Sequence, residues 1–137
     1  ALGLSQLKRL SEILNQRMEI GAFYQEQLRG VPGIQLPLEK TAYSENNYWV
    51  FGLVLNGEMT GKAKEVRAEL GSFGIGTRPF FQPLHRQPVL QKFGLSDQMK
   101  LPVSEDLGNS GFYIPNGLGT DISDFGYVVD CVVKVLS

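Results

Sequence analysis

Apolar side chains recur at helical spacing through the first thirty residues of the chain. Gly30 and Pro32 follow this stretch, and both residue types commonly end helices. The pattern predicts one helix over residues 2–29, about 40 Å long. A domain of this size is only roughly 35–40 Å across, so part of the helix face is expected to lack a partner within the chain. The apolar positions are Leu4, Leu7, Leu10, Ile13, Leu14, Met18 and Leu28.

Three short stretches after this helix have the composition of strands. Residues 34–36 fit a short edge strand, and residues 111–115 fit a second strand of aromatic and β-branched side chains. Residues 47–57 are apolar at nearly every position, which predicts a central strand with both faces covered.

Helical patterns separate these strands. A first helix is expected from a Thr60 cap to about Phe73, where Gly74 would terminate it. One or two turns are expected near residues 88–94, and a short helix near 102–108. A final helix is expected from a Thr120 or Ser123 cap to Leu136. Its valine run also fits a strand, but the helix is favoured because one helical face carries Phe125, Val128, Val129, Val132 and Leu136.

The alternation of these elements predicts an α+β fold, in which helices pack on a small mixed or antiparallel sheet. With 137 residues the chain suits one domain, comprising the long helix at 1–30 and an α+β body at 31–137. Its first residue is Ala1 rather than methionine, which fits a processed chain or a piece of a longer one.

The composition argues against nucleic-acid binding, a membrane span and disulfide bonding. The net charge is −1 and charges of both signs are scattered, which argues against a nucleic-acid partner. No apolar run approaches the roughly 20 residues of a membrane span, and no signal-peptide pattern is present. Cys131 is the single cysteine, so no internal disulfide forms, and a reducing, cytoplasmic location is expected. It lies among valines and is read as a buried hydrophobe.

The segment GIGTRPFFQPLHRQP, residues 74–88, holds the strongest candidate chemistry. Arg78 precedes Pro79, which favours extended backbone and a guanidinium held out for a phosphate or carboxylate. A surface arginine paired with a nearby acid is an equal alternative. His85 is the single histidine, and it either contacts a polar ligand or braces its own loop. No metal site is expected, because no carboxylate cluster accompanies His85.

Aromatic side chains near this segment are the remaining candidates. Phe80 and Phe81 are expected to point to opposite sides, one into the core and one toward a pocket. Tyr48 and Trp49 stand at the start of the central strand and also point to opposite faces. Such an aromatic lines a ligand site or belongs to the core. No nucleophile elbow, catalytic triad or P-loop is present, so the residues alone indicate a ligand-facing loop without a reaction.

Several longer motifs resemble the C-terminal region of the DegT/DnrJ/EryC1/StrS family of pyridoxal-phosphate-dependent sugar aminotransferases. The first 28 residues resemble its A-A-L-G-L-x-Q-L and R-x-x-I-x-x-x-Y-x-x-x-L patterns, with Arg17, Ile20 and Tyr24 at the anchor positions. The family's next strand is similar to NYWVFGLVL. Its G-I-x-T-R-x-x-F-x-P-L-H block resembles GIGTRPFFQPLH, and its P-x-(S/A)-E-x-L…LP segment resembles LPVSEDLGNSGFYIPNG. The wording of the third motif is most similar to perosamine-synthase-like members.

This resemblance implies a specific role. Family members are fold-type-I aminotransferases that act as dimers, and a large N-terminal domain holds the cofactor and its Schiff-base lysine. The resemblance implies that the smaller domain closes over a nucleotide-sugar substrate, a GDP-linked 4-keto-6-deoxy sugar in perosamine synthesis for lipopolysaccharide O-antigen. Arg78 would then meet phosphate or sugar oxygens, and His85 would bind or orient the sugar. Thr77 and Phe81 would stand beside them, with Tyr48 as a further substrate-binding candidate.

The chain departs from the family in one large respect. It has seven lysines and none occupies the Schiff-base context, so the chain alone is expected to bind no pyridoxal phosphate and to be inactive. Two hypotheses follow: the small domain of such an enzyme, or a stand-alone, non-enzymatic binding module that retains the fold. In either case an unpaired apolar stripe is expected to dock on a cofactor-binding domain or on a second copy of the chain.

Overall fold

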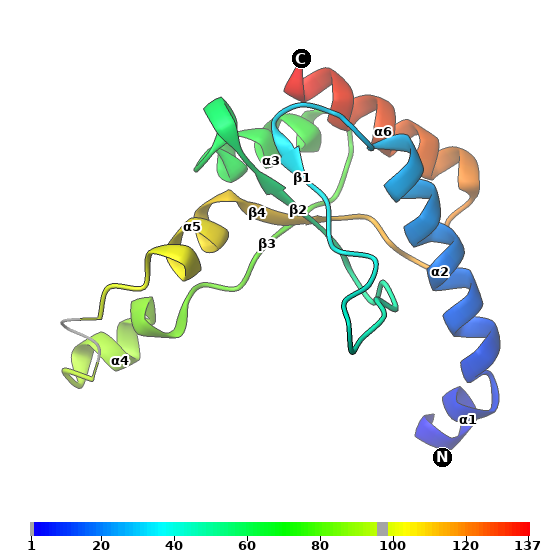
Figure 1. Cartoon of the computed structure of the whole chain (residues 1–137), viewed down its shortest axis with the longest axis horizontal. Helices are drawn as coiled ribbons and strands as arrows, with labels where there is room; N and C mark the ends of the chain where they lie inside the picture. The colour runs from blue at the N-terminus through cyan, green and yellow to red at the C-terminus, as the bar shows by residue number, and fades with distance from the viewer. Residues whose placement is uncertain (1, 96–98) are drawn as a thin grey trace.

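A four-stranded antiparallel sheet lies at the centre of the computed structural model, which describes residues 2–95 and 99–137 (Figure 1). The helices are α1 (Leu2–Lys8), α2 (Leu10–Gln27), α3 (Ala63–Ser72), α4 (Pro88–Lys92), α5 (Pro102–Ser110) and α6 (Ile122–Leu136). The strands are β1 (Ile34–Gln35), β2 (Phe51–Leu55), β3 (Arg78–Pro79) and β4 (Gly111–Ile114), and η1 (Gly57–Met59) and η2 (Leu84–Arg86) are 3₁₀ turns.

The strand order is β1-β2-β4-β3, and every neighbouring pair is antiparallel. β2 and β4 form the centre, with Phe51 opposite Ile114, while β1 and β3 are two-residue edge strands. The α+β prediction is therefore confirmed, and of its two alternatives the sheet is antiparallel. β3 falls inside the 74–88 segment, and its proline is tolerated because β3 is an edge strand.

The hydrophobic core lies between one face of the sheet and helices α2, α3 and α6. Phe51, Leu53 and Leu55 point into it, since alternate residues of a strand share a face. The Tyr24 ring of α2 lies 4.9 Å from the Phe51 ring and 5.6 Å from the Phe125 ring of α6, centroid to centroid. The second face of β2, formed by Gly52 and Val54, is only half-buried. The expectation that both faces of this strand are covered is therefore confirmed for one face and only partly met for the other.

The expected long N-terminal helix is broken. Arg9 separates α1 from α2, with its N–H donating to the Gln6 carbonyl oxygen at 3.0 Å and its guanidinium bound to Glu12. The prediction of one continuous helix is wrong at this point. Residues 3–12 are exposed, so no tertiary packing enforces the regular helical ladder there and local contacts decide. The expectation of an unpartnered apolar stripe is confirmed by the exposed side chains of Leu4, Leu7 and Leu10.

Helix ends follow the sequence signals better than helix starts. Gly74 adopts a φ of 78°, and the next N–H, of Ile75, donates to the Leu70 carbonyl oxygen at 3.0 Å, as a glycine terminator predicts. The expected caps are wrong, because α3 starts after Lys62 and α6 after Asp121, neither with a side-chain cap bond. Thr60 instead closes η1 by donating its N–H to the Gly57 carbonyl oxygen.

The C-terminal valine run is helical, as favoured. α6 buries Phe125, Val128, Val129 and Val132 against the sheet and neighbouring helices, and Cys131 is buried with them. Its reading as a small core hydrophobe is thereby confirmed.

A second region projects from the sheet. Residues 81–95 and 99–110, which carry η2, α4 and α5, form an arm that extends away from the core helices, to the left in Figure 1. Apolar side chains of this arm are exposed at Phe81, Leu84, Val89, Phe93, Leu95, Leu101, Val103 and Leu107.

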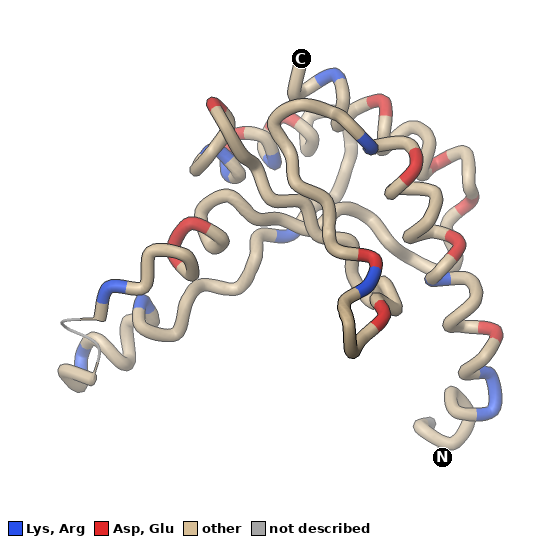
Figure 2. Tube along the Cα trace, in the orientation of Figure 1, with Lys and Arg blue, Asp and Glu red and all other residues tan. Residues whose placement is uncertain are grey.

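Charges of both signs are interspersed along the described chain, as Figure 2 shows. Among the described helices, none combines the length and hydropathy that crossing a bilayer requires.

Candidate functional site

Arg78 lies on the edge strand β3, where the sequence predicts extended backbone. The strand pairs with β4, with Arg78 opposite Tyr113 and Pro79 opposite Phe112. The Arg78 side chain is exposed and forms part of the wall of a cavity of about 280 Å³. This cavity, called the Arg78 cavity below, is lined by Trp49, Val50, Gly76, Arg78, Tyr113, Ile114, Pro115 and Asn116.

The guanidinium of Arg17 braces the segments behind this cavity. Arg17 of α2 donates through Nη1 to the carbonyl oxygens of Trp49 at 2.9 Å, and of Tyr48 and Asn116 at 3.4 Å. Asn116 Nδ2 also donates to the Tyr48 carbonyl oxygen, at 2.6 Å. One arginine therefore holds the entry to β2 and the exit from β4 in register.

Tyr48 is part of this brace rather than of the cavity lining. Its side chain is 3% exposed, stacks on Phe51 and covers Gly21, where any Cβ would collide with the tyrosine ring. Its φ of 48° is rare for a residue with a side chain and is held by the surrounding hydrogen bonds. Trp49 then points the opposite way, as expected, and is 68% exposed at the cavity.

Phe80 and Phe81 also diverge. Phe80 packs on the half-covered sheet face, against Gly52, Gly111 and the ring of Tyr113, whose centroid lies 4.6 Å away. Phe81 is 86% exposed. Thr77 adjoins Arg78 and is half-buried, and its carbonyl oxygen accepts a long 3.5 Å hydrogen bond from Arg67.

His85 occupies a different place from Arg78. It is 6% exposed, and its Nε2 lies 2.9 Å from Glu105 Oε1 of α5. Arg86 donates to the other oxygen of the same carboxylate, at 2.6 Å. The hydrogen bond with His85, assisted by Arg86, lowers the pKa of Glu105. His85 thus joins η2 to α5, which is the loop-bracing role left open by the sequence.

The two strongest sequence candidates therefore do not share a cavity. His85 lines a mostly apolar hollow in the arm, with Leu84, Leu90, Leu101 and Ser104 among its neighbours. Of the five predicted substrate residues, the structure brings together Thr77 and Arg78, buries Tyr48 and His85, and leaves Phe81 on the surface.

The sequence does not point to two residues of these sites, Asn116 and Glu105, and it does not show whether Tyr48 or Trp49 faces the cavity. Asn116 has no signal beyond its place after Ile114-Pro115. Glu105 stands in the P-x-(S/A)-E motif, which marks its position but does not reveal its partner.

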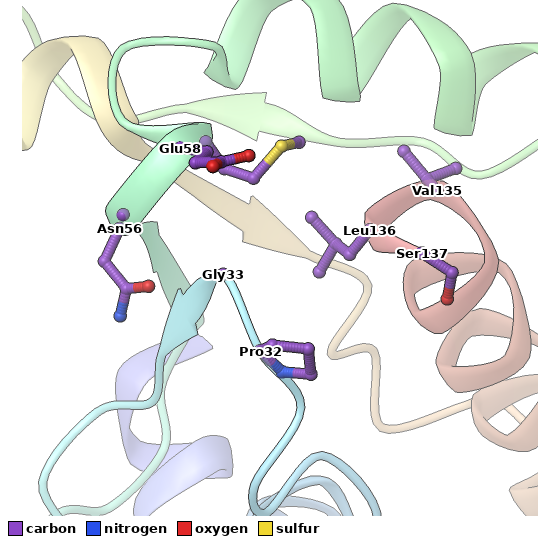
Figure 3. A pocket seen from close by; sticks show the side chains of 9 residues that line it. Pro32, Gly33, Asn56, Glu58, Val135, Leu136 and Ser137 are labelled. Atoms are coloured by element: carbon purple, nitrogen blue, oxygen red, sulfur yellow. The ribbon is translucent and has the colours of Figure 1, made fainter.

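A third cavity, of about 430 Å³, lies between the β1–β2 end of the sheet and the end of α6. Glu58 and Leu136 approach it from opposite sides, with Pro32 and Gly33 near them (Figure 3). Glu58 is its single ionisable side chain, so the cavity lacks an acid–base pair. Among the described residues no cluster of three metal-ligating side chains occurs.

The residues of this chain do not fit pyridoxal phosphate by themselves. A Schiff-base lysine needs a desolvated pocket that lowers its pKa. All seven lysines are exposed, and none lines the three cavities described above. No step of cofactor chemistry is assigned to this chain.

The described residues form a small antiparallel sheet packed with helices, with a cavity beside the edge strand that carries Arg78. The structure matches Helicobacter pylori PseC, an aminotransferase involved in the biosynthesis of pseudoaminic acid, with a TM-score of 0.86 at 18% identity, over 98% of this chain and 36% of that one. It also matches Escherichia coli GDP-4-keto-6-deoxy-D-mannose-3-dehydratase, with a TM-score of 0.77 at 19% identity, over 95% of this chain and 33% of that one. At these identities the likeness establishes the fold alone.

The sequence identifies the family. Residues 1–133 match the model of the DegT/DnrJ/EryC1/StrS aminotransferase family, and the chain belongs to this family of pyridoxal-phosphate-dependent aminotransferases. It is 25% identical to the GDP-perosamine synthase of Vibrio cholerae over 132 residues, which are 96% of this chain and 35% of that protein. The chain thus spans about a third of the length of the curated relative.

Proposed function

We propose that the chain forms the smaller, substrate-side domain of a nucleotide-sugar aminotransferase of the perosamine-synthase type. The substrate class is a nucleotide-linked 4-keto-6-deoxy sugar, GDP-linked in the perosamine case. Family membership and the Vibrio cholerae relative support this assignment. The observation that carries it is the exposed Arg78 guanidinium on the wall of a cavity, within the family-like segment at 74–88.

The side chains divide the work in this proposal. Arg78 donates hydrogen bonds to phosphate or sugar oxygens, and Thr77 stands beside it. His85 acts through Glu105 to hold the arm, and Phe81 offers an exposed apolar contact on the same arm. Tyr48 shapes the cavity from behind. Pyridoxal phosphate, held elsewhere in the enzyme, supplies the amino-group transfer.

The exposed apolar surfaces support a partner. The α1–α2 stripe of Leu4, Leu7 and Leu10 and the separate arm both expose apolar side chains, and exposed apolar patches mark interaction sites. We propose that these surfaces dock on a cofactor-binding domain or on a second copy of the chain, and that the enzyme is a cytoplasmic homo-oligomer in O-antigen biosynthesis. The chain alone is then inactive, because no lysine lines the three cavities described above.

The first test is the DNA upstream of Ala1. A reading frame for a lysine-bearing domain is expected, and co-expression of both parts should aminate the GDP-linked 4-keto sugar with glutamate as donor. Arg78→Met should lower kcat/KM by about tenfold or more, while Arg29→Met, a change at an exposed arginine outside the cavity, should not.

Two results would contradict the proposal. A stop codon with a nearby start upstream of Ala1 would favour the non-enzymatic binding module. A stoichiometric absorbance band on adding pyridoxal phosphate to the 137-residue chain would contradict its inactivity. A dehydratase from Escherichia coli shares this fold, so the fold of this region does not specify the reaction. The aminotransferase activity must therefore be assayed directly.

A further inference from the structure

Three side chains that line the Arg78 cavity, Trp49, Arg78 and Asn116, carry groups that a ligand could contact. The Trp49 indole is largely exposed. Within residues 2–95 and 99–137, no carboxylate oxygen lies within 4.0 Å of a nitrogen of the Arg78 side chain. Asn116 Oδ1 is buried and accepts no hydrogen bond from any described residue.

The orphan oxygen of Asn116 is not a matter of side-chain orientation. Asn116 Nδ2 donates to the Tyr48 carbonyl oxygen at 2.6 Å, so turning the amide over would place oxygen against oxygen. Buried polar atoms without a partner are rare in native structures, and each one requires an explanation. The strained backbone of Tyr48 lies beside it, and such strain concentrates at ligand sites.

The three groups have complementary chemistry. An exposed indole offers an apolar face, a guanidinium offers donors, and a lone amide oxygen offers an acceptor. A sugar ring presents the matching set: a face of C–H groups, oxygens that accept, and hydroxyls that donate. A cavity of about 280 Å³ is at the small end of ligand pockets, which suits one ring rather than a whole nucleotide sugar.

An anion fits this arrangement less well. Arg78 is the single cationic side chain lining the cavity, and the guanidinium of Arg17 behind it already donates to three carbonyl oxygens. The Asn116 oxygen would also repel a phosphate oxygen placed beside it. The lining therefore favours a neutral, hydroxyl-bearing ligand.

We propose that Trp49, Arg78 and Asn116 form a subsite for the pyranose ring of the sugar substrate. The indole packs on the C–H face of the ring, Arg78 donates to ring or carbonyl oxygens, and Asn116 Oδ1 accepts from a hydroxyl. Because Asn116 Oδ1 is covered in the free chain, a side chain at the cavity must shift when the ring binds. The inference rests on the proposed function and names the part of the substrate that this cavity holds.

The test is a titration of the ¹⁵N-labelled 137-residue chain with three probes in parallel: methyl α-D-mannopyranoside, GDP and GDP-mannose. Saturable shifts of the Trp49 indole N–H and the Asn116 side-chain amide are expected with both sugars. GDP alone should leave these two signals in place. No saturable shift of either signal at tens of millimolar mannoside or GDP-mannose would overturn the subsite.

Variants separate the cavity from a non-specific surface effect. Trp49→Ala should weaken mannoside binding by about tenfold, whereas Tyr43→Ala, at an aromatic 92% exposed and outside the cavity, should not. Arg78→Met should weaken it severalfold with no loss of stability, because the side chain is exposed, and Arg29→Met is its matched control. Equal losses for Trp49→Ala and Tyr43→Ala would also overturn the subsite.

The outcomes distinguish this inference from the proposed function. If GDP-mannose moves signals of Arg78 but not of Trp49 or Asn116, the sugar subsite is wrong while nucleotide-sugar binding survives. If the mannoside moves Trp49 and Asn116 but no cofactor domain is encoded upstream, the subsite stands and the enzyme assignment fails.

Discussion

The core and the arm of this molecule differ in how far their apolar side chains are buried. In the core, apolar side chains from α2, β2, β4 and α6 are almost fully enclosed, with Tyr24, Phe51, Phe112 and Phe125 at no more than 1% exposed. In the arm, side chains of similar type face solvent, and the polar cluster of His85, Arg86 and Glu105 joins its two halves. Apolar residues thus stabilise the first region from within, whereas in the second many of them are exposed to solvent.

The sharpest test of this contrast compares two phenylalanines. Phe51→Ala in the core should lower the free energy of unfolding by about 3–5 kcal/mol, because it removes an enclosed ring and leaves a cavity. Phe93→Ala in the arm should change it by less than about 0.5 kcal/mol, since that ring is already exposed. Urea denaturation of both variants measures the difference. Similar losses would mean that the arm ring is buried in solution.

The contact between α2 and Tyr48 gives a second test inside the core. Gly21→Ala places a methyl group against the Tyr48 ring and should cost about 1–3 kcal/mol. Gly71→Ala in α3 is the matched control, because nothing lies within 4 Å of its added Cβ. That control should be neutral or stabilising by about 0.5–1 kcal/mol. Thermal unfolding of both proteins gives the comparison, and a neutral Gly21→Ala would contradict the placement of Tyr48.

The polar cluster of the arm predicts a dependence on pH. Glu105 has a lowered pKa in the folded chain, so its contribution is present above the ordinary glutamate value of about 4.3 and is lost as the pH falls through the lowered pKa. Glu105→Gln should lower the free energy of unfolding at neutral pH and flatten the stability curve in the acid range, because the variant lacks the carboxylate that His85 and Arg86 bind. Denaturation at a series of pH values measures both effects. Glu26→Gln, at an exposed position on α2, should change neither, and an unaltered acid limb in Glu105→Gln would refute the role of the cluster.

The smallest effect on stability is expected from the apolar surface of the arm. Replacing Val89 and Phe93 together by serine should change the free energy of unfolding by less than about 0.5 kcal/mol but reduce self-association of the chain. Sedimentation velocity over a range of concentrations measures this, with Gln91→Ser on the same helix as control. Unchanged association would place the docking surface elsewhere, with the α1–α2 stripe as the next candidate.

The sequence predicted the elements well where short-range patterns decide them. The apolar face of α6, the strand at 111–114 and the Gly74 terminator all agree with the structure. It failed at the Arg9 break and at two helix starts, where neither packing nor a capping side chain enforces the expected boundary. Arg78 was placed correctly as exposed and extended because the effect of a following proline is local.

The candidate site was predicted only in part, because it is assembled from distant segments. Tyr48 and Trp49 were both noticed, and only the packing of Tyr48 over Gly21 shows that Trp49 is the one at the cavity. His85 and Glu105 lie 20 residues apart and meet only when η2 folds against α5. No spacing rule in the sequence encodes these meetings.

By itself, the sequence determined the element types, the α+β class and the family, since these depend on patterns repeated over a few residues and on motifs read in order. The tertiary structure alone decided which polar side chains face a cavity and which form hydrogen bonds inside the fold. The hydrogen bond from Arg17 to Asn116, across 99 residues, shows the physical reason. Long-range packing selects one arrangement of loops among many that the same local patterns allow.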